Sequence, residues 1–150
     1  MAVTARDVLG RLQGNEPNVE YVSVHWEECA RRRLRKVTDR GTEVVIDLPP
    51  GPPLADGDIL IRETQRTIAV RMLPADILVA RPASLREMGT LCYQIGNLHQ
   101  PVWVGEEEVV LPDEPQNEAL LQRSHLPYAK ERRLLPQGFA TSRTGHTHVL

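Results

Sequence analysis

The pattern of apolar residues changes at Pro74-Ala75, and this change constrains the fold more than any other feature of the chain. Before it, short β-type runs are separated by turns rich in glycine and proline; after it, β-type runs alternate with helical patterns. A chain of 150 residues forms one domain or two small ones. We therefore expect two domains, residues 1–74 and 75–135, followed by a flexible tail, 136–150, without periodicity.

The first domain is predicted to be small and all-β. Val22, Val24 and Trp26 share one side of a period-two strand over residues 21–26. Gly41 lies at the end of a short loop between two β-type runs, which indicates a hairpin. The further expected strands are 33–37, 42–48, 59–61 and 67–73. Residues 3–13 are compatible with either a short helical turn or an irregular arm.

The second domain is predicted to contain both helices and strands, so the chain as a whole belongs to the α+β class. The expected strands are 77–80, 102–104, 108–111 and 128–135, the last of them a weak or edge strand. One helix is expected before Gly96-Asn97 and a second from Pro115. This order, β-α-β-β-α-β, is the split ferredoxin-like arrangement.

The first helix of this domain has a clear start and one apolar stripe. Ser84 is a plausible N-cap, and Glu87 three residues later completes a capping-box pattern. The apolar residues at helical spacing are Leu85, Met88, Leu91, Cys92 and Ile95. We therefore interpret Cys92 as a small core residue and not as a metal ligand.

His99 lies at a predicted corner between this helix and the next strand. Gly96-Asn97 predicts the helix end, because both residues tolerate the left-handed conformation found there. Pro101 then prevents further helix. Most single histidines in globular proteins are solvated or core residues, and we interpret His25 and His125 in that way. The stiff backbone around His99, by contrast, suits a metal ligand.

One imidazole does not hold a metal ion by itself, because first-row metals usually take about four to six ligands. A symmetric dimer removes this objection, since a residue near a two-fold axis meets its own copy. His99 would then supply two imidazoles to one site. Imidazole suits Ni²⁺, and also Zn²⁺ and Cu²⁺.

The stretch Gly96-Asn97-Leu98-His99, followed by Pro101, resembles the Gly-Asn-x-His motif of the UreE family of urease accessory proteins. The resemblance extends to the first half, through the segment from Trp26-Glu27-Glu28 to Arg33-Leu34-Arg35, then Asp47-Leu48-Pro49 and residues 54–58. It implies a cytoplasmic homodimer that carries Ni²⁺ on His99 of each chain and delivers it to apo-urease. It also implies a peptide- or partner-binding first domain that docks the urease activation complex, including the accessory GTPase UreG.

The tail supplies two further candidate ligands. His146 and His148 form a His-x-His pair, and short histidine tracts bind borderline metals; the alternative is a purely solvated tail. Many members of the family have a long His-rich tail, and some have histidines in the strand after the motif. This chain has only the one pair, and residues 106–110 contain no histidine. Bulk nickel storage is therefore not expected.

Composition excludes several other classes of protein. A net charge of −2 does not indicate nucleic acid or membrane binding, and no apolar run is long enough to span a bilayer. The N-terminal residues lack a signal-peptide pattern. Cys29 and Cys92 cannot form a disulfide framework and fit a reducing cytosol. No nucleophile–base pair, P-loop or dinucleotide turn indicates an enzyme.

A cluster of basic residues in the first domain supports an alternative function. The cluster consists of Arg31, Arg32, Arg33, Arg35, Lys36 and Arg40. Stacking aromatics for nucleic-acid binding are missing, so an acidic protein surface is the better partner, and Arg33 and Arg35 are the candidate contacts. The alternative is therefore a non-metal module that binds protein or RNA through this Arg-rich hairpin, with strongly salt-dependent binding.

Overall fold

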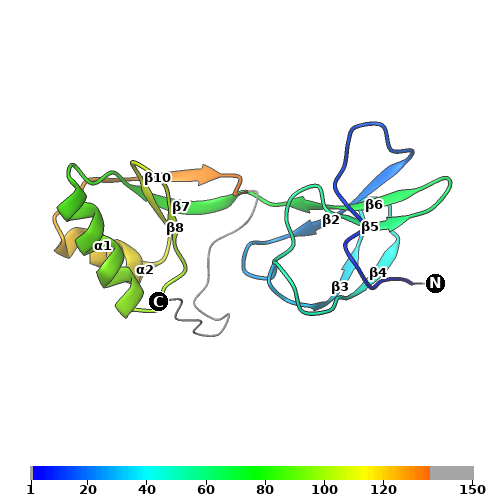
Figure 1. Ribbon diagram of the computed structural model, residues 1–150, viewed down its shortest axis with the longest axis horizontal. Helices are drawn as coiled ribbons and strands as arrows, with labels where there is room; N and C mark the ends of the chain where they lie inside the picture. The colour runs from blue at the N-terminus through cyan, green and yellow to red at the C-terminus, as the bar shows by residue number, and fades with distance from the viewer. Residues whose placement is uncertain (1, 136–150) are drawn as a thin grey trace. The chain divides into compact units, whose positions relative to one another are not determined.

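The computed structural model describes residues 2–135 and divides them into two compact units. The N-terminal unit extends to Pro74, and the C-terminal unit is Ala75–Arg133. Strands alone form the first unit, and a sheet with two helices forms the second (Figure 1), which confirms the α+β class. The tail with His146 and His148 lies outside the described residues.

The N-terminal unit contains two three-stranded sheets, ordered β1-β4-β3 and β2-β6-β5. Their strands are β1 (Val3–Ala5), β2 (Val19–Val24), β3 (Arg33–Val37), β4 (Glu43–Asp47), β5 (Ile59–Arg62) and β6 (Thr67–Met72). The β3–β4 hairpin is confirmed, with Arg33 opposite Asp47 in the antiparallel register. The arm or helical turn expected near the N-terminus is wrong at residues 3–5, because β1 pairs in parallel with β4.

The core of this unit uses the period-two pattern of its strands. Val22 and Val24 of β2 are completely buried, and Ile46 of β4 and Ile68 of β6 are buried with them in one cluster. Trp26 is partly buried against the same cluster. β2 and β4 thus contribute one apolar side to the core, as the alternation predicted, whereas β6 is buried on both sides from Thr67 to Val70.

Glu20 is a buried carboxylate in this unit, with 7% of its surface exposed. The Thr38 hydroxyl donates a hydrogen bond of 2.7 Å to Glu20 Oε2, and Arg66 lies 3.8 Å from Oε1. Burial by itself raises the pKa of Glu20, but hydrogen bonds from Thr42 and Thr38 and the charge of Arg66 outweigh it, so the net pKa is lowered. The ionised form is therefore favoured in the folded state.

We expect Glu20 to make the stability of this unit depend on pH. A lowered pKa in the folded state stabilises the fold above the ordinary glutamate value of 4.5, and this contribution is lost as pH falls through the folded value. Glu20→Gln should lower the free energy of unfolding by about 1–2 kcal/mol at neutral pH, and the difference from wild type should shrink below about pH 4. Urea unfolding between pH 3 and 7 measures this, with the exposed Glu27→Gln as the control.

The C-terminal unit forms a four-stranded sheet ordered β10-β7-β9-β8, with both helices on one side (Figure 1). The elements are β7 (Ala75–Ala80), α1 (Leu85–Asn97), β8 (Trp103–Val104), β9 (Val109–Pro112), α2 (Pro115–Arg123) and β10 (Tyr128–Arg133). The order β-α-β-β-α-β and the antiparallel sheet match the predicted ferredoxin-like arrangement. β10 is an edge strand, as its charged residues indicated.

The capping box at the start of α1 is present. Ser84 is the N-cap, and its hydroxyl accepts a hydrogen bond of 3.2 Å from the backbone N–H of Glu87. The Glu87 carboxylate accepts a hydrogen bond of 2.7 Å from the backbone N–H of Ala83. In the usual capping box this bond comes from the N–H of the N-cap residue, which here is Ser84. Leu91 and Ile95 are buried, as predicted, but Leu85 is 92% exposed. The prediction that Leu85 belongs to the buried apolar stripe was therefore wrong. At 100° per residue, Leu85 points more than a quarter turn away from Leu91.

The other side of the sheet has no helix among the described residues, and charged side chains lie on it. Ile77, Val79 and Val110 are buried there, and Glu131 pairs with Ile77 in the β-register. The ion pairs on this side join Arg81 to Glu108 and Glu131, and Arg133 to Glu108 and Glu131. Neither helix among residues 2–135 has the length or the apolar composition needed to span a bilayer.

Candidate metal site at the end of helix α1

His99 lies two residues beyond Asn97, the last residue of helix α1. Its φ of +53° places it in the left-handed region, whereas Gly96 and Asn97 both remain inside the helix. The backbone N–H of His99 donates a hydrogen bond of 3.1 Å to the carbonyl of Gly96, and the backbone N–H of Gln100 donates one of 3.4 Å to the carbonyl of Ile95. These two bonds are the Schellman motif, with His99 at the position that glycine usually occupies. Helix α1 thus ends at Asn97, as predicted, but the left-handed residue is His99 and not Gly96 or Asn97.

The same motif ends helix α2. His125 has φ +53°, its N–H donates to Gln122 at 3.2 Å, and the N–H of Leu126 donates to Leu121 at 3.2 Å. A left-handed conformation costs a residue with a side chain roughly 1–2 kcal/mol relative to the right-handed one. Both helices of this unit thus end on a histidine where a glycine would be less strained. His125 supplies a matched internal comparison for His99.

The His99 side chain is exposed, as are Asn97 and Leu98 before it. Among residues 2–135, no three His, Cys, Asp or Glu side chains come together closely enough to hold a metal ion. One chain therefore presents a single imidazole at this corner, held by a fixed backbone. Such a group is accessible to a second protein molecule.

An exposed stripe of small and apolar residues runs along α1 toward this corner. We call it the α1 stripe; it consists of the exposed Leu85, Gly89, Tyr93 and Gly96 and of the half-buried Cys92. Leu85 is 92% and Tyr93 is 71% exposed, and open space surrounds the position that a Cβ would occupy at Gly89 and at Gly96. Glycine inside a helix costs about 1 kcal/mol relative to alanine. Two such residues on one exposed side leave room for another helix to approach closely.

Cys92 does not add a ligand to this site. Its thiol is half-buried, with Sγ 3.9 Å from Met88 Sδ. Burial raises the pKa of the Cys92 thiol, so the thiolate that binds metals is disfavoured. This agrees with its interpretation as a packing residue.

Comparison with known proteins identifies the family. Residues 5–73 match the N-terminal domain of the UreE urease accessory protein, and residues 75–149 match its C-terminal domain. The chain belongs to the UreE family. The urease accessory protein UreE of Geobacillus kaustophilus is 39% identical over 132 residues, which are 88% of each chain. The protein of the same name from Acetivibrio thermocellus is 35% identical over 132 residues, 87% of this chain and 86% of its own.

A third UreE protein, from Haemophilus influenzae, is 39% identical over 130 residues, which are 85% of this chain and 70% of its own length. The UreE motif that was quoted from the sequence, Gly96 to His99, falls within the matched C-terminal domain. The assignment that rested on this motif is thus confirmed at the level of the family.

Arg33 and Arg35, the candidate partner contacts in the UreE N-terminal domain, differ in how available they are. Arg33 Nε lies 3.0 Å from Asp47 Oδ1, and Arg6 contacts the same carboxylate at 3.4 Å. Arg35 is exposed and makes no ion pair with any residue of the described part. A hollow of about 380 Å³ lies beside them and is lined by both. Arg35 is therefore the more available cation.

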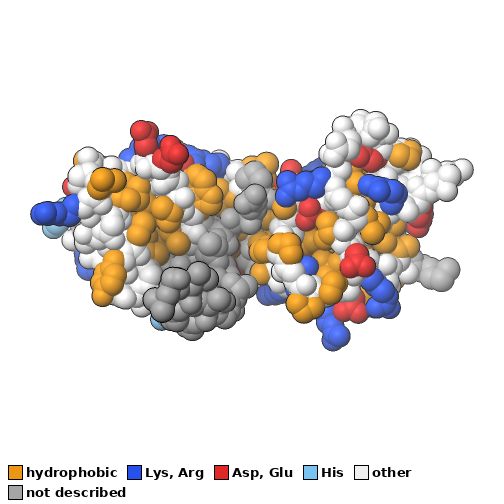
Figure 2. Space-filling view, in the orientation of Figure 1, with side chains coloured by type: hydrophobic (Ala, Val, Ile, Leu, Met, Phe, Trp, Pro, Cys, Tyr) orange, Lys and Arg blue, Asp and Glu red, His pale blue; other side chains and the backbone are white. Residues whose placement is uncertain are grey.

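Two other members of the basic cluster, Arg32 and Lys36, are committed within the unit, whereas Arg31 is exposed and makes no ion pair with a described residue. Arg32 donates hydrogen bonds to the carbonyls of Gly51 and Pro52, at 3.1 and 2.7 Å, and Lys36 pairs with Glu28. Figure 2 shows basic and acidic side chains interspersed over the visible side of the N-terminal unit. This mixture does not resemble the continuous basic surface that nucleic acid requires.

The α1 stripe is the feature that the sequence interpretation missed. The signal was available, since Gly89 and Gly96 are seven residues apart in a helical pattern and a helical projection places both beside Tyr93. Leu85 was instead assigned to the core because of its spacing from Met88.

Proposed function

We propose that the chain is a nickel carrier, not an enzyme, which works as a cytoplasmic homodimer and delivers Ni²⁺ to apo-urease during assembly of the urease metal centre. The observation that carries this proposal is the exposed His99, fixed at the left-handed end of α1 directly after the exposed α1 stripe. Membership of the UreE family supports it. Packing of two α1 stripes across a two-fold axis would bring the two His99 side chains to one metal ion.

A site of this kind is suited to transfer of the metal. Two imidazoles leave open positions on Ni²⁺ for water or for further ligands, and His146 and His148 of the tail are the candidates. An incomplete, exposed site allows the acceptor to replace ligands one at a time. Because only neutral imidazole binds a metal, protonation of the ligands releases the ion as pH falls. Zn²⁺ and Cu²⁺ would bind the same donors, so delivery to the correct target depends on docking of the partner.

The N-terminal unit is the proposed docking module for the urease activation complex, including the accessory GTPase UreG. Arg35, exposed beside the hollow on β3 and β4, is the first residue to test, with Arg33 as its neighbour. The second candidate function, a non-metal module that binds protein or RNA through this hairpin, rests on the same exposed cation. It predicts binding that weakens strongly with salt and does not depend on His99.

Calorimetric titration of the purified chain with Ni²⁺ tests the carrier proposal. We expect one nickel ion per two chains, at a site that weakens but persists when the chain ends at Thr144 and so lacks His146 and His148. His146→Ala with His148→Ala in the full chain is the matched control for the loss of the other tail residues. Absence of a shared site in the full chain would favour the non-metal module instead.

A further inference from the structure

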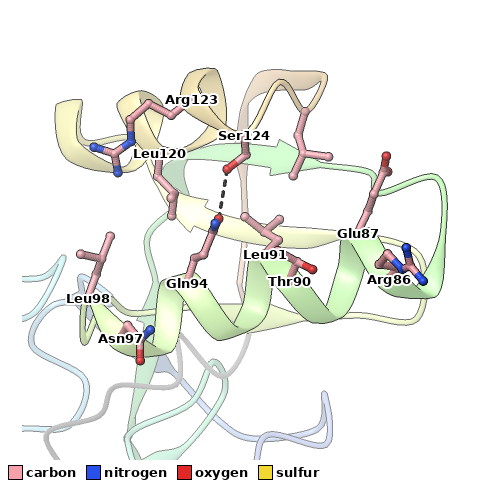
Figure 3. Close-up of a pocket in the computed structure, with 11 residues that line it drawn as sticks. Arg86, Glu87, Thr90, Leu91, Gln94, Asn97, Leu98, Leu120, Arg123 and Ser124 are labelled. Carbon is pink, nitrogen blue, oxygen red and sulfur yellow. Dashed lines mark hydrogen bonds between the residues drawn. The ribbon is translucent and has the colours of Figure 1, made fainter.

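A groove runs between helices α1 and α2 on a side of α1 that the α1 stripe does not use (Figure 3). It encloses about 550 Å³. Leu91 and Leu120 are buried in it, and Leu98 is 44% exposed at its edge. The Ser124 hydroxyl donates to Gln94 Oε1 across the groove at 3.1 Å. The groove therefore combines an apolar base with uncharged polar groups.

Two arginines without an ion-pair partner among the described residues flank this groove. Arg86 and Arg123 line it, and neither makes an ion pair with any residue of the described part. Figure 3 shows Arg86 at one end and Arg123 toward the other. The one acidic residue that lines it, Glu87, already accepts the N–H of Ala83 at 2.7 Å. The three charged residues that line the groove, Arg86, Arg123 and Glu87, have a net charge of +1, which favours a ligand with negative charge at its ends and apolar groups between.

The groove would stay open in the proposed dimer. Thr90, Gln94 and Asn97 line it, and each follows a residue of the α1 stripe by one position along the helix. One position turns a side chain by about 100°. Helix packing through Gly89 and Gly96 would therefore leave Thr90 and Gln94 accessible, whereas Arg86, seven residues before Tyr93, lies close to the side that the α1 stripe occupies.

We propose that this groove binds an acidic amphipathic helix of a protein partner. The lining residues of α1 run from Arg86 to Leu98, a length of about 18 Å at 1.5 Å per residue. This elongated shape fits about three turns of a helix better than a compact anion. Apolar residues at i, i+4 and i+7 of the partner would contact the exposed Leu98 and the partly exposed Leu126, above the buried Leu91 and Leu120. Acidic residues before and after them would pair with Arg86 and Arg123.

A peptide selection on the full chain tests this proposal. The probe is a phage library of random 12-residue peptides, panned in buffer with a metal chelator so that the result is independent of the nickel proposal. We expect enriched peptides with apolar residues at helical spacing and acidic residues at the flanks. Arg86→Ala with Arg123→Ala should weaken their binding roughly tenfold, and Thr90→Trp, which fills the groove, should abolish it.

Matched variants make the result decisive. Arg31→Ala with Arg62→Ala removes two exposed arginines that make no ion pair within the described residues, and it should leave peptide binding unchanged. Enrichment of basic or uncharged peptides, absence of enrichment, or binding insensitive to the groove variants would overturn the proposal. A loss of dimer in the groove variants, measured by sedimentation, would overturn it too, because the occupant would then be a second copy.

Discussion

Replacement of His99 by glycine is expected to abolish the shared nickel site while stabilising the fold slightly. The imidazole is lost, and no other His, Cys, Asp or Glu cluster among residues 2–135 replaces it. Glycine relieves the left-handed conformation at φ +53°, worth roughly 1–2 kcal/mol. Its greater freedom in the unfolded chain offsets about 0.4–1 kcal/mol of that gain. Calorimetry with Ni²⁺ and urea unfolding measure the two effects on one protein.

His125→Gly is the control for this substitution. It makes the same change at the same position of the Schellman motif of α2, so it should stabilise the fold similarly and leave nickel binding unchanged. His99→Ala should also remove the site, with the fold intact but without the gain in stability. If His99→Gly unfolded the protein while His125→Gly did not, His99 would be a structural residue and its role as a ligand would be wrong.

Much of the fold could be predicted because short-range patterns determine it. Val22 and Val24 alternate with polar residues and are buried as a period-two strand requires. The capping box at Ser84 and Glu87 needs only residues that are near in sequence, and it forms. The β-α-β-β-α-β order followed from such elements, and connection rules then restrict the topology.

The features that the sequence did not reveal depend on long-range contacts. β1 is a strand because Val3 to Ala5 pair with β4, about 40 residues away, and nothing in its own pattern requires this. The geometry at the end of α1 depends on the hydrogen bond from the Gln100 N–H to the Ile95 carbonyl. With this bond the left-handed residue is His99, and not Gly96 or Asn97 as expected. One ion pair of Arg133 similarly reaches Glu108, which lies 25 residues away and directly before β9.

The candidate site was found through one local motif and remained incomplete for a physical reason. A sequence identifies His99 as unusual, but a site shared across a two-fold axis depends on the surface that brings two chains together. That surface was not recognised, because Leu85 was assigned to the core. Its 92% exposure instead associates it with Tyr93 and the two glycines.

Tyr93→Glu is expected to dissociate the proposed dimer and to remove the shared nickel site without touching His99. Tyr93 is 71% exposed in the single chain, so the fold should tolerate the change. Across the proposed two-fold axis, the substitution would place two carboxylates close together in an apolar interface. Like charges in contact cost several kcal/mol, and about 3 kcal/mol corresponds to a roughly 100-fold rise in the dimer dissociation constant. Analytical ultracentrifugation measures this directly.

Protein concentration then distinguishes loss of the dimer from damage to the ligand. In the Tyr93→Glu variant, both His99 side chains are intact, so nickel binding should return as the protein concentration approaches the raised dissociation constant, whereas in His99→Gly it should not return at any concentration. Val37→Glu, which changes a 59% exposed residue of the N-terminal unit, should leave both dimer and nickel binding unchanged. A Tyr93→Glu protein that stayed dimeric and bound one nickel ion per two chains would show that the subunits meet elsewhere. His99 would then reach its partner by a route other than the α1 stripe.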